Sequence, residues 1–136
     1  VLTLALRYKP RAIMLSFGSI SPFVASIKDA GVPLICQVQT LEQALEVKEQ
    51  GADIIVAQGT EAGGHGSTEP LLSLLAKVLD AVDELPVMAA GGLVDGNDVH
   101  DVISLGAQGV LMGTQFYASQ ESLGKLEQKT TDSSGI

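Results

Sequence analysis

Cysteine is nearly absent from this chain of 136 residues, since Cys36 is the only one. A single thiol excludes a disulfide framework, and without a CxxC pair or a Cys/His cluster a structural zinc site is not expected. Basic side chains are also scarce, with 8 Lys and Arg against 16 Asp and Glu, which gives a formal net charge of −8. Because such a chain repels phosphate backbones and anionic lipid, neither nucleic acid nor a membrane is the expected partner.

Long apolar runs are missing as well, and none approaches the ~20 residues that cross a bilayer. The first residues, VLTLALR, lack the basic start and the cleavage pattern of a secretion signal, so a cytoplasmic protein is expected. The chain does not begin with Met, which predicts that it is a piece of a longer gene product. Its apolar content of 46% is enough to build the core of one domain.

Short apolar stretches alternate with longer segments of helical periodicity. Strands are predicted for residues 12–17, 32–38, 52–57, 87–90 and 110–112, and helices for residues 21–30, 41–50, 68–84 and 95–105. Capping residues mark the helix starts: Ser21 for the first, Thr40 with Gln43 for the second, and Asp95 or Asn97 for the last. The strands are apolar on both faces, as in a parallel sheet covered by helices, so the fold class is α/β.

Two architectures fit this pattern. A doubly wound open sheet of five strands suits the length, and so does part of a (β/α)8 barrel, which needs ~250 residues when it is complete. The pattern of strands and helices does not choose between them. In both, ligands bind at the carboxyl ends of the strands.

Glycine gathers at three of these strand ends. The segments are residues 58–67 (QGTEAGGHGS), 89–92 (AAGG) and 113–114 (GT). Glycine has no Cβ, so a ligand can approach the backbone N–H groups, and turns that lead into helix starts favour an anion. Together the second and third turns predict a phosphate site, although a single Gly-Gly pair is more often only a tight turn. Neither a GxGxxG nor a Walker A sequence is present, which disfavours a dinucleotide or ATP site.

His65 follows two of these glycines, where its side chain would face the ligand. Imidazole titrates near neutral pH and can take a proton from carbon or donate a hydrogen bond to a developing anion. The alternative is a structural hydrogen bond within the loop. Glu61 either pairs with His65 or caps the loop backbone. The other histidine, His100, is expected on a solvated helix face, and Cys36 is expected to be buried and inert.

With these residues in view, the chain resembles the nitronate monooxygenase family, formerly called 2-nitropropane dioxygenases, whose members are FMN enzymes built on a (β/α)8 barrel. The resemblance rests on GADIIVAQGTEAGGH (residues 51–65), AAGGL (89–93) and LGAQGVLMGTQF (105–116), in this order. It covers roughly residues 12–122. It implies a partial barrel, approximately strands four to eight, within residues 1–122, followed by a polar tail over residues 123–136.

The resemblance also implies roles for single residues. His65 matches the catalytic histidine, which acts as a base on the carbon next to the nitro group or positions the nitronate. The residues that match the FMN site are Gln58, Gly63, Gly64, Ala90, Gly91, Gly92, Gly113 and Thr114. In the implied reaction the nitronate, a nitroalkane anion, reduces FMN and O2 reoxidises it, which gives a carbonyl compound and nitrite. No metal is implied.

The first three strands of the barrel, and an N-terminal loop that covers the flavin in the family, have no counterpart in the sequence. Five parallel strands cannot close an eight-stranded barrel, so we expect an incomplete piece whose open edges invite self-association. Two other functions stay open. One is an FMN-dependent enoyl-acyl-carrier-protein reductase that uses a nicotinamide donor, and the other is a non-catalytic, phosphate-binding half-barrel remnant.

Overall fold

The computed structural model describes residues 1–62 and 68–124. The strands are β1 (Ile13–Ser16), β2 (Leu34–Val38), β3 (Ile54–Gln58), β4 (Val87–Ala90) and β5 (Gly109–Leu111). The helices are α1 (Leu2–Arg7), α2 (Ser21–Asp29), α3 (Leu41–Gln50), α4 (Leu71–Val82), α5 (Gly96–Leu105) and α6 (Thr114–Ala118). The α/β class and the five strands are confirmed, whereas the short helices α1 and α6 were not predicted. No helix in the described ranges is both long and apolar enough to span a membrane.

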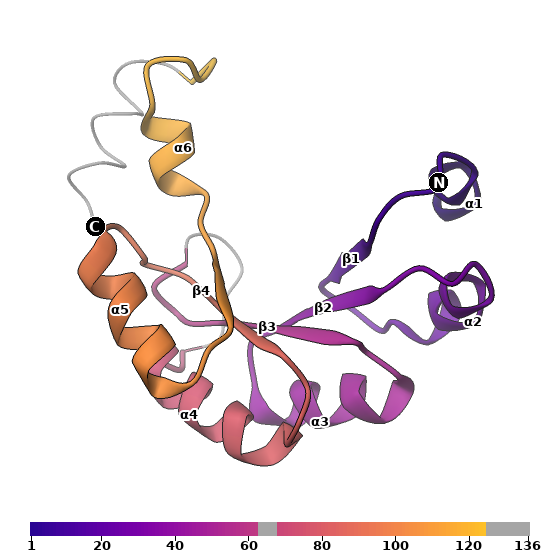
Figure 1. Cartoon of the computed structure of the whole chain (residues 1–136), viewed down its shortest axis with the longest axis horizontal. Helices are drawn as coiled ribbons and strands as arrows, with labels where there is room; N and C mark the ends of the chain where they lie inside the picture. The colour runs from indigo at the N-terminus through magenta and orange to yellow at the C-terminus, as the bar shows by residue number, and fades with distance from the viewer. Residues whose placement is uncertain (63–67, 125–136) are drawn as a thin grey trace.

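The order of the strands decides the architecture. All neighbouring strands are parallel, and they are hydrogen bonded in chain order, β1-β2-β3-β4-β5. In a doubly wound sheet the strand order reverses at one point, so that some consecutive strands are not neighbours. In a (β/α)8 barrel each strand lies next to the one before it in the chain. Helices α2 to α5 follow one another around the outer side of the curved sheet (Figure 1). The chain is therefore part of a barrel, and in the described ranges β1 and β5 have no strand on their outer sides.

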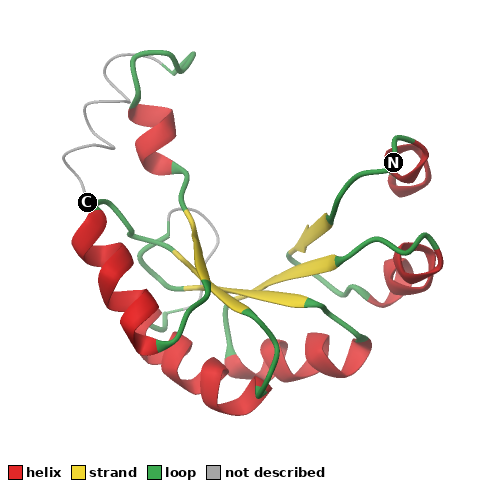
Figure 2. Cartoon of the chain, in the orientation of Figure 1, coloured by secondary structure: helices red, strands yellow, loops and turns green. Residues whose placement is uncertain are grey.

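The two faces of the sheet have different surroundings. Alternate residues of the strands pack under the helices, where Leu34, Cys36 and Val38 of β2 are at most 1% exposed. The side of the sheet away from the helices forms the concave face (Figure 2). Strand register places Met14 beside Ile35 and Val56 beside Met88 on this concave face. Such a face is the interior of a closed barrel.

The helix starts follow the predicted capping pattern at two of three places. The Thr40 hydroxyl accepts the N–H of Gln43 at 3.1 Å, and Asp95 caps α5 in a reciprocal capping box with Asp98. The expectation for Ser21 was wrong, because Ser21 is itself the first residue of α2 and Ile20 is the N-cap. Pro22 still occupies the first turn, where its missing N–H costs nothing.

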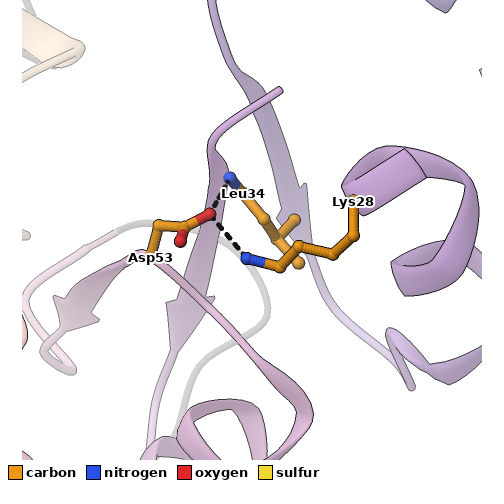
Figure 3. Close-up of polar contacts among 3 residues, drawn as sticks. All are labelled: Lys28, Leu34 and Asp53. Atoms are coloured by element: carbon orange, nitrogen blue, oxygen red, sulfur yellow. Dashed lines mark hydrogen bonds and ion pairs between the residues drawn. The ribbon is translucent and has the colours of Figure 1, made fainter. Parts of the chain in front are cut away.

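A charged contact ties the amino ends of β2 and β3 to α2. One oxygen of Asp53, Oδ2, accepts the backbone N–H of Leu34 at 2.8 Å and Nζ of Lys28 at 2.9 Å (Figure 3). Partial burial raises the pKa of Asp53, but the hydrogen bonds from Leu34 and Lys28 outweigh it and hold the pKa below its ordinary value of 3.8. This contact lies at the edge of the sheet opposite the carboxyl ends, where ligands bind in barrels.

Candidate functional site

A cavity of about 700 Å³ lies at the carboxyl ends of β3, β4 and β5. Its lining consists of Gln37, Gln58, Glu61, Ala62, Ala90, Gly91, Gly92, Leu93, Leu111, Met112, Gly113 and Thr114. All the predicted site residues that the structure describes are among them, namely Gln58, Ala90, Gly91, Gly92, Gly113 and Thr114. The predicted residues Gly63, Gly64 and His65 lie outside the described residues. The fold therefore brings the turns after β4 and β5 to one cavity, as the sequence predicted.

The glycine pair after β4 is needed by the fold. Gly91 and Gly92 have φ angles of +106° and +67°, a left-handed conformation that side chains rarely adopt. A Cβ on Gly92 would lie 2.6 Å from the Cβ of Glu61, and one on Gly91 would lie 3.0 Å from the backbone nitrogen of Ala62. The turn after β4 thus packs closely against the loop after β3, and both line the cavity.

Gly113 contrasts with this pair. Its φ is −127°, which any residue adopts, and a Cβ built on it would meet no atom within 4 Å. Packing within the described chain therefore does not require glycine at this position. Gly113 and Thr114 both line the cavity, and Gly113 is exposed, so its backbone is accessible to a bound group.

Glu61 caps a helix from a distance. Its two carboxylate oxygens accept the backbone N–H of Leu71, the first residue of α4, at 3.1 and 2.9 Å. The N-cap residue of this helix, Pro70, provides no side-chain acceptor, so Glu61 fills that role. Backbone capping, one of the two alternatives for Glu61, is observed and fixes the start of α4 beside the cavity. The other alternative is pairing with His65, which lies outside the described residues.

Three glutamines contact one another beside the cavity, where Gln37 and Gln58 belong to its lining and Gln39 does not, and only Gln58 was predicted as a site residue. Oε1 of Gln58 accepts Nε2 of Gln37 and Nε2 of Gln39, each at 2.9 Å. Gln37 is the last but one residue of β2 and Gln39 directly follows the strand, and neither was predicted as a site residue. The pattern that could have revealed them is polar residues at alternate positions at the end of an apolar strand.

Two other reactive side chains lie away from the site. His100 is exposed on α5, with Nε2 at 3.4 Å from the Ser104 hydroxyl. Cys36 is 1% exposed, and burial, followed by the negative charge of Asp53, raises the pKa of its thiol to about 11. Among residues 1–62 and 68–124 no group of His, Cys, Asp and Glu side chains is arranged to hold a metal ion.

Comparison with known proteins agrees with this geometry. A family model described as "Nitronate monooxygenase" matches residues 1–131. The chain belongs to the nitronate monooxygenase family. Members of this family are enzymes, and they are flavin-dependent oxidoreductases.

Individual relatives carry more than one name. A "Probable nitronate monooxygenase" from Bacillus subtilis is 41% identical over 129 residues, which cover 88% of this chain and 37% of the relative. A "(3aS,4S,5R,7aS)-5-hydroxy-7a-methyl-1-oxo-octahydro-1H-indene-4-carboxyl-CoA dehydrogenase" from Rhodococcus jostii is 40% identical over 119 residues, which cover 88% of this chain and 33% of the relative. The solved structure of a FabK mutant from Thermotoga maritima has a TM-score of 0.89 at 32% identity, covering 96% of this chain and 43% of that one. The chain thus spans 33% and 37% of the lengths of these two curated relatives.

Proposed function

We propose that the chain is the FMN-binding part of an enzyme that oxidises nitronates with O2 to a carbonyl compound and nitrite. One observation carries the proposal: the turns at Gly91–Gly92 and Gly113–Thr114 line the same cavity. In barrels the loops after the last two strands are the usual phosphate grip. The family match and the relative from Bacillus subtilis support the nitronate as substrate.

The residues of the cavity suit FMN. Backbone N–H groups at Gly92, Gly113 and Thr114, with the Thr114 hydroxyl, are donors of the kind that phosphate oxygens accept. The open space at Gly113 leaves room for a phosphate against the backbone. Gln58 lies beside Ala90 in the strand register and would contact the ring system. Bound FMN would supply the redox chemistry of the site, with the nitronate as electron donor and O2 as electron acceptor.

His65 is the residue we assign to the proton at the carbon next to the nitro group. As a base it would take that proton from a neutral nitroalkane and so form the nitronate, and as a donor it would hold the nitronate oxygen in place. The apolar residues Leu93 and Leu111 of the cavity would exclude water from the reacting atoms. We also propose that copies of the chain associate through the uncovered edges at β1 and β5.

The test is a titration of the chain with FMN and with riboflavin, followed by flavin fluorescence. A phosphate grip predicts that FMN binds at least about tenfold more tightly than riboflavin, since charge-assisted hydrogen bonds are lost with the phosphate. The flavin-loaded protein is then supplied with a nitronate, and nitrite is measured. A His65→Ala variant should keep the yellow colour and lose most of the turnover.

Other results would select the alternatives. Oxidation of NADH with an enoyl thioester, without nitrite release, would support a reductase. The reductase is the second candidate because the name of the Rhodococcus jostii relative also contains a CoA thioester. A colourless protein that takes up neither flavin would contradict both enzymes and favour a non-catalytic remnant.

A further inference from the structure

Gln37 and Gln58, which line the cavity, lie on the same face of the sheet as Gln39, which directly follows β2. Val38 of β2 is paired with Ala57 of β3, so the next residues along, Gln39 and Gln58, are opposite each other. Gln37 lies two residues before Gln39 and therefore shares its face of the sheet. Both amides contact the same atom, Oε1 of Gln58, at 2.9 Å.

This arrangement sets the direction of the Gln58 side chain. A carboxamide has one oxygen with two acceptor sites and one nitrogen with two N–H donors. Gln37 and Gln39 occupy both acceptor sites of Gln58, while within residues 1–62 and 68–124 its Nε2 makes no hydrogen bond. Gln58 also lines the cavity, so its two N–H donors are available to a ligand there.

We infer that Gln37 and Gln39 are positioning residues, which hold the Gln58 carboxamide so that Nε2 donates to an acceptor atom on the ring system of FMN. The polar edge of that ring carries carbonyl oxygens and a ring nitrogen that accept hydrogen bonds. The identity of the ligand rests on the proposed function, whereas the direction of the carboxamide rests only on the three glutamines.

Gln39 is the better residue for a test, because it does not line this cavity. Its backbone N–H donates to Oε1 of Gln43 at 2.8 Å, and Thr40 caps α3 immediately after it. The start of α3 therefore holds Gln39 in place next to Gln58. Gln39 contacts Gln58 directly, and a Gln58→Leu background tests whether its effect on a ligand in the cavity passes through Gln58.

The first experiment needs no flavin. Side-chain amide exchange, measured by NMR on the 15N-labelled chain, should show slow exchange for Nε2 of Gln37 and Gln39 and fast exchange for Nε2 of Gln58. The opposite pattern, with Gln58 slow and the other two fast, would mean that the amides point the other way, and it would overturn the inference.

The second experiment exchanges a donor for an acceptor of the same size. Gln39→Glu should turn the Gln58 carboxamide round and weaken FMN binding about tenfold, as expected for one lost hydrogen bond and one misplaced acceptor. In a Gln58→Leu background the same change should alter the FMN affinity less than about twofold, because residue 39 then has no carboxamide at position 58 to turn round. Gln108→Glu, the same substitution at an exposed position before β5, is the control and should change nothing.

The outcomes separate the two proposals. If Gln39→Glu weakens FMN binding equally in the wild-type and Gln58→Leu backgrounds, or does not weaken it at all, the positioning role is overturned. A chain that shows the expected exchange pattern but binds no FMN would contradict the proposed function and the ring acceptor, and would leave the direction of the carboxamide established.

Discussion

The carboxylate of Glu61 accepts the backbone N–H of Leu71, ten positions further along the chain, with both of its oxygens. A second bond, from the N–H of Thr60 to the carbonyl oxygen of Glu69 at 2.9 Å, lies beside it. Together they join the two ends of the segment that contains His65. Since Glu61 also packs against the turn at Gly92, one side chain connects the loop after β3, helix α4 and the turn after β4.

Glu61→Ala should lower the free energy of unfolding by about 1–2 kcal/mol, since it removes a helix cap and leaves the N–H of a buried residue without its acceptor. Glu61→Gln keeps one oxygen acceptor and should lose about half as much. Urea denaturation measures both. Glu84→Ala, at an exposed position after α4, is the control, and an equal loss there would contradict the capping role.

Alanine at the two glycine turns should separate folding from ligand binding. Gly92→Ala places a Cβ in the left-handed region and against Glu61, so it should cost about 2 kcal/mol of stability or more. Gly113→Ala meets no atom of the described chain and should change stability by less than about 0.5 kcal/mol.

If a phosphate lies against Gly113, however, Gly113→Ala should weaken FMN binding about tenfold or more while the thermal melting curve stays unchanged. Unchanged FMN affinity in this variant would place the phosphate elsewhere.

Stability should depend on pH through Asp53. The pKa of its carboxyl is lower in the folded chain than its ordinary value of 3.8, so the ionised form stabilises the fold above that value. This contribution is lost as the pH falls through the folded pKa. Asp53→Asn should therefore be less stable than the wild type at pH 7, and the difference should narrow as the pH falls below 3.8. Urea midpoints at pH 7 and at about pH 3 check this.

Lys28→Met divides the contribution of Asp53 into its two contacts. The Lys28 and Asp53 side chains are 39% and 44% exposed, so water screens the ion pair, and Lys28→Met should have the smaller effect. A larger loss for Lys28→Met than for Asp53→Asn would mean that the bond to Leu34 contributes little.

Cys36 should not react while the chain is folded. With a pKa of about 11, only about one thiol in a thousand is ionised at pH 8, and the side chain is 1% exposed. A thiol reagent at pH 8 should label it at least about a hundredfold more slowly in buffer than in urea. Ser26→Cys adds an exposed thiol on α2 as the reference. Equal labelling rates for the two thiols would show that the packing between α2 and β2 opens readily.

Local sequence signals were sufficient for most of the elements. Apolar runs placed the five strands, and Thr40 and Asp95 placed two helix starts, because a cap and the first turn of a helix are close along the chain. The prediction for Ser21 was wrong, since the backbone angles of this one residue decide whether it is the N-cap or the first residue of the helix. The pattern of glycines predicted the turns after β4 and β5 for the same local reason.

The sequence by itself determined the class of fold, the glycine turns and the likeness to a family, all of which depend on residues near one another in the chain. The likeness to the family implied part of a barrel, which the pattern of strands and helices alone did not, and the tertiary structure confirmed it, because strand order is a matter of hydrogen bonds between distant segments. Only the tertiary structure decided that Glu61 caps α4 and that Gln37 and Gln39 hold Gln58. These contacts span 10 to 21 positions of sequence, and they exist only once parallel pairing has brought the carboxyl ends of the strands to one edge.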